Sequence, residues 1–261
     1  MKLLLVLLLT FSFSIKAEEN IAWKDFKESF IDLFKAFPYQ FQTKSNAYTM
    51  GLAVPTLAYS FDQDDRISNL FRSKKEKPLY NFMADLSIAA NFPIIPFGFY
   101  ALGRSQEDDK MIRFSKEVFV ATYLAAWQTV ILSFIPVNER PNNDVSFWEK
   151  SFRGSSSFPS GHVMPFAVLT MKTLQFYGPT QALIPGIMTF MTAYQRVQEG
   201  KHYFSDVLGG IFLSIFASEG ARLYSNHQNN HPFYKAIFEH EVRVSFMRKN
   251  GAPGLMASWS Y

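Results

Sequence analysis

Three short segments of the chain hold the residue types that bind and transfer a phosphoryl group. They are Asn-Glu-Arg-Pro at 138–141, Pro-Ser-Gly-His at 159–162, and Arg196 followed by His202 and Asp206. Guanidinium groups bind phosphate oxygens in pairs, and a neutral imidazole can attack phosphorus. Each segment alone is a weak signal, but their order and spacing make the set a strong one.

His202 and His162 divide the chemistry between them. Asp206 follows His202 by four residues, a spacing that places both side chains on one face of a helix. There the carboxylate can hold the second ring nitrogen and fix the tautomer, so we expect His202 to be the nucleophile. His162 is then the general acid, which protonates the leaving alkoxide and afterwards activates water.

Phosphate binding falls to two arginines and to the Ser-Gly pair. A phosphate monoester carries roughly two negative charges, which the guanidinium groups of Arg140 and Arg196 match. Ser160 and Gly161 precede an apolar run that begins at Val163. Their backbone N–H groups are therefore expected at a helix N-terminus, without intrahelical partners and able to hold phosphate oxygens.

These motifs resemble those of the type 2 phosphatidic acid phosphatase and vanadium haloperoxidase superfamily. The family's third motif, Ser-Arg, five residues, His, three residues, Asp, stands at 195–206 with Gln195 in place of the Ser. Its second motif is intact at 159–162. Its first motif, Lys, six residues, Arg-Pro, keeps the Arg-Pro pair at 140–141 and has Ser133 at the Lys position.

The resemblance implies the same roles as the residue chemistry. In the family the third-motif His is the nucleophile, the second-motif His is the acid, and the Arg residues with Ser-Gly cradle the phosphate; no metal or other cofactor is implied. The family Lys helps to neutralise the phosphate. Because Ser133 has no charge, another cation would have to take over this role. Lys150, Arg153 and Lys201 are nearby in the sequence, and Arg153, between the first two motifs, is the expected replacement.

An all-α fold is expected, with a six-helix bundle core of the phosphatidic acid phosphatase and haloperoxidase type. The resemblance covers about residues 48–222, and the apolar segments in this range are 48–61, 86–103, 118–138, 163–177, 179–195 and 207–218. Segments 86–103 and 118–138 carry no charge over 18 and 21 positions, so each is long enough to approach a membrane span. The mean hydropathy of −0.03 favours a less strongly embedded protein.

The order of the helices brings the three motifs together. If 86–103 and 118–138 span and the N-terminus is outside, the basic residues between them fall inside and Arg140 emerges outside. The Gly178-Pro179 turn then returns the third motif to the side of the second. All three motifs are therefore expected at one end of the bundle.

Both ends of the chain lie outside this helical domain, which we set at 48–222. Residues 1–17 have the anatomy of a secretory signal peptide or an uncleaved signal anchor. Residues 18–47 hold an amphipathic helix whose stripe, expected to pack on its own domain, is Trp23, Phe26, Phe30, Phe34 and Phe37. Residues 223–261 form a tail in which alternation around 250–254 predicts a short β-hairpin.

Composition sets further bounds. With 261 residues and 48% hydrophobic content the chain can bury one sizeable core, and it has no Cys for disulfides or thiol catalysis. The net charge of +4 is dispersed, so nucleic acid is not an expected partner. The acidic run Asp62-Gln63-Asp64-Asp65 lacks the Gly and distal Glu of a calcium loop and is interpreted as a solvated turn.

The sequence therefore predicts an exported, metal-independent phosphatase that hydrolyses phosphate monoesters through a phosphohistidine. The favoured substrate is a lipid phosphate, phosphatidate-like or isoprenyl-phosphate-like, and a small soluble ester is the other choice. Alternatives are a phosphotransferase to a lipid or sugar hydroxyl, or a non-catalytic phospholipid-binding envelope protein with a degraded first motif. A vanadate-dependent haloperoxidase is disfavoured by the missing Lys. The expected location is a bacterial cell envelope, either in the inner membrane with a periplasm-facing site or in the periplasm; protein partners are not indicated.

Overall fold

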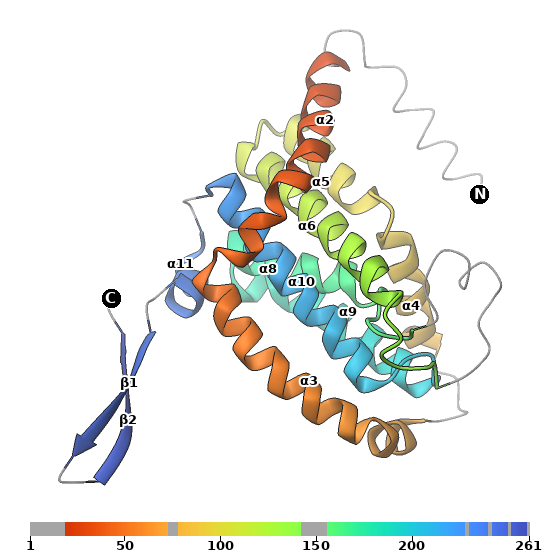
Figure 1. Cartoon of the computed structure of the whole chain (residues 1–261). Coiled ribbons are helices and arrows are strands. Elements are labelled where there is room, and N and C mark those ends of the chain that lie inside the picture. Colours follow the sequence, from red (N-terminus) through yellow and green to blue (C-terminus); the bar gives the residue numbers. More distant parts are fainter. Residues whose placement is uncertain are drawn as a thin grey trace.

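The structure is a computed structural model, drawn in Figure 1. It describes residues 19–72, 78–141, 156–227, 230–239, 242–249 and 252–259. The expected signal segment, residues 1–17, lies outside the described residues.

Helices make up almost all of the described chain, which confirms the all-α prediction. They are α2 (Glu19–Ala36), the 3-10 helix η2 (Pro38–Phe41), α3 (Lys44–Phe71), α4 (Pro78–Ala90), α5 (Ile94–Ser105), α6 (Asp109–Ser133), α8 (Met164–Tyr177), α9 (Pro179–Gln198), α10 (Phe204–Ser225), α11 (Pro232–Tyr234) and the π-helical turn η3 (Lys235–Glu239). Strands β1 (Val242–Lys249) and β2 (Ala252–Trp259) pair antiparallel, with Val242 opposite Trp259. The two residues between the strands are Asn-Gly, a pair favoured in hairpin turns. The structure therefore has the predicted pair of strands, and β2 begins at Ala252.

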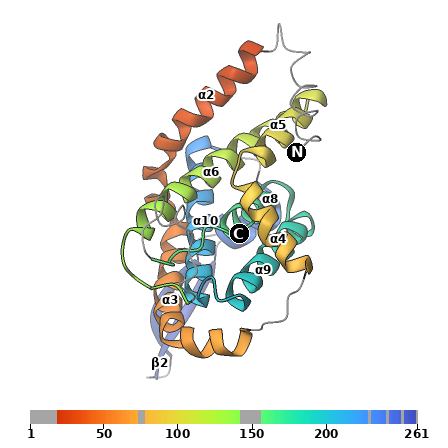
Figure 2. The ribbon, with the colours of Figure 1, turned by 90° about the vertical axis from the view of Figure 1, so that its right-hand side faces the viewer.

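Helix α10 runs through the middle of the bundle and packs against α3, α6 and α8 (Figures 1 and 2). Its buried face carries small residues, which let neighbouring helices approach closely. Ala217 and Ala221 lie in one apolar cluster with side chains from three other helices: Leu33, Ala36, Phe119, Val120, Leu124, Met164 and Val168. Burying each of the larger side chains contributes about 1.5–3 kcal/mol.

Local signals set the ends of the helices that lead to the motifs. The Asp108 side chain accepts from the Met111 N–H at 3.0 Å and caps the start of α6. Gly178, with φ at 92°, ends α8, and Pro179 begins α9 at once. As expected, α6 and α9 run toward the motif end of the bundle, whereas α8 and α10 run away from it.

The apolar segment 86–103 is not one helix. It is divided between α4 and α5, whose axes differ by 71° across a short break. Pro93 stands at this break, and a residue before proline is disfavoured in helical geometry. By length and composition, one described helix, α10, could cross a membrane, and the bent α4–α5 pair passes the same test as a unit. Within the tested window of α10, however, 67% is buried inside the bundle.

Helix α2 differs from its predicted packing. Its buried face consists of Ser29, Leu33 and Ala36, and Phe26 packs beside them on α6. The other four stripe residues are exposed: Trp23, Phe30, Phe34 and Phe37. The prediction that the whole stripe packs on the domain is therefore wrong, because the buried face is rotated away from it. Figure 2 shows the N-terminal part of α2 extending beyond the other helices.

A buried ion pair ties three helices together at the end of the bundle remote from the motifs. Lys172 on α8 is fully buried, and its Nζ donates to the Glu117 carboxylate on α6 at 2.8 Å. The same ammonium donates to the Gln175 side chain at 2.8 Å and to the Ser218 carbonyl of α10 at 2.7 Å. All three of its N–H donors therefore have acceptors, which is the condition under which a buried charge is tolerated.

Candidate functional site

The three motif segments meet at one end of the bundle, as predicted. The Ser160 N–H donates to the Asp206 carbonyl at 2.8 Å, which joins the second segment to the third. Two residues before the second segment, the Ser157 N–H donates to the Asn138 carbonyl at 2.9 Å, which ties the chain leading into the second segment to the first. Backbone hydrogen bonds thus hold the three segments in a fixed relation.

His202 and Asp206 are in contact, but not in the way the spacing predicts. The distance from His202 Nδ1 to Asp206 Oδ2 is 3.4 Å, and both side chains are fully buried. His202 lies before α10 begins at Phe204, so the two residues do not share a helical face. Asp206 instead reaches back from the first turn and accepts the Tyr203 N–H at 2.8 Å. The bend of the chain around this cap, not helical periodicity, brings the carboxylate to the imidazole.

His162 faces His202. The ring centroids are 6.0 Å apart, with an angle of 62° between the ring planes. His162 lies in the turn before α8 and is only partly buried, whereas His202 is fully buried. At this distance, a phosphoryl group could lie between the two imidazoles and contact both of them.

Burial controls the electrostatics of Asp206. It raises the pKa of the Asp206 carboxyl to about 6, against the lowering effects of the Tyr203 N–H, of the Ser157 and Asn138 side chains, and of the Arg140 charge. Arg140, half-buried just beyond α6, therefore belongs to the electrostatic environment of this carboxylate. A group with a pKa near 6 changes its charge close to neutral pH.

Gln195, the residue that departs from the family motif, contacts Arg196 directly. Its Oε1 accepts the Arg196 Nε–H at 2.7 Å, and its Nε2 donates to Asn81 Oδ1 on α4 at 3.2 Å. Arg196 also lies 3.4 Å from the Glu199 carboxylate, measured from Nη2 to Oε2. The amide at position 195 can therefore orient the guanidinium, and Asn81 is a supporting residue that the sequence analysis missed.

The phosphate cradle differs from expectation at Ser160. Its N–H is not left without a partner, because it donates to Asp206. Its hydroxyl is fully buried and has no hydrogen-bond partner within the described part of the chain, which leaves Oγ able to bond a ligand. Gly161 is partly buried beside it, ahead of α8, which begins at Met164.

Ser133 stands at the position of the family Lys. Ser133 is fully buried, and its hydroxyl donates to the Val130 carbonyl of its own helix at 2.7 Å. Arg153, the expected replacement, and Lys150 lie outside the described residues.

The acidic run at 62–65 is not a solvated turn. It lies within α3, where Asp64 is only 5% exposed while Asp62 and Asp65 face solvent. Asp64 accepts hydrogen bonds from Ser205, between His202 and Asp206, and from Asn138. The interpretation as a turn was wrong, because four consecutive polar residues give no helical periodicity from which the inward-facing position of Asp64 could be recognised.

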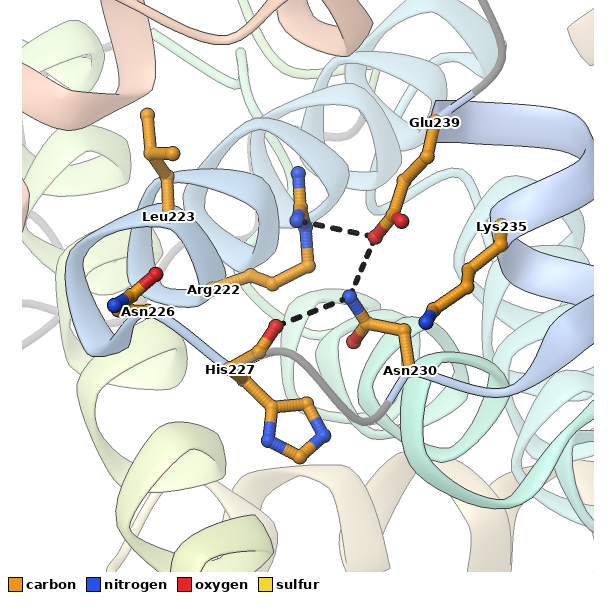
Figure 3. A pocket seen from close by; sticks show the side chains of 7 residues that line it. All are labelled: Arg222, Leu223, Asn226, His227, Asn230, Lys235 and Glu239. Atoms are coloured by element: carbon orange, nitrogen blue, oxygen red, sulfur yellow. Dashed lines mark hydrogen bonds and ion pairs between the residues drawn. The ribbon is translucent and has the colours of Figure 1, made fainter.

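A separate cavity of about 120 Å³ lies near the other end of α10 (Figure 3). Arg222, His227, Asn230 and Glu239 are among the residues that line it. Asn230 bridges the His227 carbonyl and the Glu239 carboxylate, while Arg222 pairs with Glu239 at 3.2 Å. Sixteen residues of helix separate Arg222 from Asp206, or roughly 24 Å, so this cavity is not part of the motif site.

Comparison with known proteins agrees with the geometry. Residues 116–229 match the family model of the PAP2 superfamily. A search of curated proteins finds no match. Among solved structures, the chain is similar to the first transmembrane PAP2 type phosphatidylglycerolphosphate phosphatase from Bacillus subtilis, with a TM-score of 0.52 and 17% identity over 69% of this chain and 95% of that one. At that identity the likeness concerns the fold. The motifs stand in the family's order at one end of an all-α bundle, and residues 116–229 match the PAP2 superfamily.

Proposed function

We propose that this protein is a metal-independent phosphatase that hydrolyses lipid phosphate monoesters through a phosphohistidine at His202. One observation carries the proposal: two imidazoles with centroids 6.0 Å apart, one of them 3.4 Å from a buried carboxylate, at the bundle end that also holds Arg140 and Arg196. The match of residues 116–229 to the PAP2 superfamily supports a phosphatase type of activity.

In the first half of the reaction, His202 Nε2 attacks phosphorus. The P–N bond forms as the ester P–O bond breaks, and His162 gives its proton to the leaving alkoxide. Asp206 accepts a hydrogen bond from the Nδ1–H of His202 and stabilises the charge that the ring gains. Arg140 and Arg196 neutralise the phosphoryl oxygens, with Ser160 Oγ and Gly161 beside them.

In the second half, water replaces the histidine. His162, now neutral, takes a proton from water as the oxygen attacks phosphorus, and the P–N bond breaks to release phosphate and regenerate His202. The proton that His162 first gave to the alcohol is thus restored by the water.

Exposed apolar side chains favour a lipid substrate. Large apolar residues face outward on several helices, among them Leu52 and Val54 on α3, Trp127 and Ile131 on α6, and Leu183, Ile184 and Phe190 on α9. Exposed apolar surface of this kind can form the contact of a protein with a membrane. The structural relative's own lipid phosphate substrate is of the same class.

We keep two wider proposals from the sequence. The phosphatase-like domain is residues 48–222, between the N-terminal segments and the tail. The protein belongs to a bacterial cell envelope, where a lipid phosphate in a membrane leaflet can reach the motif end of the bundle. Protein partners stay unassigned.

Ser133 supports one competing proposal, a phospholipid-binding protein without turnover. At the position of the family Lys, the Ser133 hydroxyl forms a hydrogen bond within its own helix. The phosphate would therefore have one positive charge fewer around it than in the family. Such a protein would bind phosphatidate and release no phosphate from it.

The deciding experiment is phosphate release from phosphatidate and from p-nitrophenyl phosphate, both in EDTA. We expect the parent to turn over and His202→Ala to lose at least about a thousand-fold in kcat. His227→Ala is the matched control, since His227 is also buried but stacks on Phe176 near the other end of α10. Phosphatidate is expected to be the better substrate. A folded parent that binds phosphatidate vesicles and releases nothing would support the binding protein instead.

A further inference from the structure

Asp64 is a buried carboxylate that the reaction above does not use. It lies on α3, outside the residues matched by the family model, yet it is only 5% exposed at the motif end of the bundle. An unpaired carboxylate at such a position would be costly, so its partners are the first question.

Ser205 supplies two of those partners. Its backbone N–H donates to Asp64 Oδ1 at 2.9 Å, and its hydroxyl donates to Oδ2. Ser205 is the second residue of α10, where backbone N–H groups have no acceptor within the helix. Asp64 therefore caps α10 from another helix, in the place where a negative charge also meets the positive end of the helix dipole.

Asn138 supplies the third partner. Its Nδ2 lies 3.3 Å from Asp64 Oδ2 and 3.3 Å from the Ser205 hydroxyl. Its carbonyl accepts the Ser157 N–H. Asn138 stands two residues before Arg140, and Ser205 stands between His202 and Asp206. One carboxylate is thus bonded to the segments that carry both a phosphate-binding arginine and the nucleophile.

We propose that Asp64 is a positioning residue, which locks the bend at Ser205 and the Asn138 segment so that His202, Asp206 and Arg140 keep their relative geometry. It does not touch the substrate. The proposal rests on the proposed phosphatase function for its kinetic test, and on the hydrogen bonds of Asp64 for its structural one. Small displacements of catalytic groups are costly, since about 1 Å can lower turnover a hundred-fold.

The charge of Asp64 is consistent with this role. Burial raises the pKa of its carboxyl, and the neighbouring charge of Asp206 raises it further, while the bonds from Ser205 and Asn138 lower it. Three donors converge on its two oxygens, which is the arrangement that an ionised carboxylate satisfies and an amide cannot.

The test compares Asp64→Asn with Asp62→Asn on the same helix. In Asp64→Asn one acceptor oxygen becomes a donor, so at least one of the three donors loses its partner. We expect kcat for phosphatidate to fall about 10-fold to 100-fold with KM changed less than about three-fold. Asp62→Asn, exposed on the same helix, is the control and should keep the parent kcat.

Other readouts separate this proposal from the phosphatase proposal and from loss of folding. The ¹⁵N NMR chemical shifts of the His202 ring are assigned by the loss of these signals in His202→Ala. They should change in Asp64→Asn and not in Asp62→Asn. This expectation does not depend on whether the parent shows turnover. If Asp64→Asn does not fold, Ser205→Ala takes its place, since it keeps the backbone bond to Asp64 and removes only the hydroxyl; we expect it to shift the His202 signals. Unchanged His202 signals in a folded variant, or an unchanged kcat in an active one, would overturn the positioning role.

Discussion

Asp206 combines a helix cap with a contact to His202, and the burial of its carboxyl carries a cost to stability. Its pKa in the folded protein, about 6, lies above the ordinary value of 3.8 because the carboxyl is buried. A raised pKa means that the fold favours the neutral acid. The stability contributed by this group is therefore fully present below pH 3.8 and is lost as pH rises through about 6. The difference corresponds to roughly 3 kcal/mol at neutral pH.

Replacing Asp206 with Asn should separate stability from activity. The amide oxygen can still accept the Tyr203 N–H, but no charge is buried, so we expect Asp206→Asn to exceed the parent in unfolding free energy at pH 7.5 by about 1–3 kcal/mol. Near pH 4 the two proteins should be nearly equal. Turnover should fall about a hundred-fold or more, because the His202 ring loses its charged partner. Urea unfolding at both pH values, with kcat at pH 7.5, measures this, and a variant less stable than the parent at pH 7.5 would contradict the argument.

The meeting of the motif residues at one end of the bundle could be predicted from the sequence, whereas the residues that support them could not. His162, His202, Asp206, Arg140 and Arg196 stand in motifs whose order and spacing are visible in the chain. Their supporting partners are not encoded locally. Asp64 is 141 residues from Ser205, and Asn81 is 114 residues from Gln195. Nothing in the sequence around an acidic run or a lone Asn indicates which distant backbone it will face.

Among the elements, α10 positions the site through close packing as well as through its N-terminus. The Pro-Ser-Gly-His loop lies directly on its first turns. A Cβ on Gly210 would clash with the Ser160 carbonyl oxygen, which is backbone and cannot rotate aside. The glycine is needed here for space, because α10 and the loop approach more closely than an alanine allows.

We therefore predict that Gly210→Ala displaces the loop that carries Ser160 and His162. Overpacking of this kind costs about 1–3 kcal/mol, and kcat should fall at least about ten-fold because both residues shift. Gly98→Ala on α5 is the matched control. Nothing lies within 4 Å of a Cβ there, so the higher helix propensity of alanine should stabilise the protein by about 0.5–1 kcal/mol. Urea unfolding and kcat are measured for both; equal behaviour of the two variants would show that the loop accommodates the methyl group.

The ends of helices were predictable where the sequence has a residue that stops or starts a helix. Gly178 followed by Pro179 marks the α8–α9 turn, and the structure has it there. Apolar runs were less informative, because an apolar run indicates that its residues are buried but does not indicate that they form one continuous helix. The run at 86–103 is uncharged throughout, yet it breaks at Pro93 into two helices. The contact of His202 with Asp206 likewise arises from a capped helix start and not from the helical period that its spacing suggests.

On the scale of the whole molecule, the two ends of the bundle differ in how their charged side chains are used. One end gathers the imidazoles, the guanidinium groups and a buried carboxylate that the proposed reaction uses. The other end buries Lys172 with Glu117 and satisfies every donor of the ammonium internally. Charges at that end bind helices α6, α8 and α10 to one another, so they contribute to the scaffold on which the reactive end depends.

The outer surface completes the argument for a lipid substrate, and α2 offers the sharpest test of it. Phe30 and Phe34 lie one turn apart, are 50% and 59% exposed, and contact each other edge to face at 5.6 Å. Lys24 and Lys27 are exposed on the same helix, which is the pattern of a helix that lies in a membrane interface. We predict that the full chain binds vesicles of phosphatidate and phosphatidylcholine, and that Phe30→Ser with Phe34→Ser weakens the binding at least about ten-fold.

The magnitude follows from the area that these side chains lose to water. Burying one Phe contributes about 1.5–3 kcal/mol when complete, so two half-exposed rings should together be worth at least one factor of ten. Phe233→Ser on α11 is the control, since Phe233 is 43% exposed but lies on another element. Co-sedimentation with vesicles over a range of lipid concentrations measures the partition of all three proteins. Equal partition of the parent and the double variant would exclude α2 from the lipid contact, while stronger loss in Phe233→Ser would move that contact to the C-terminal end of α10.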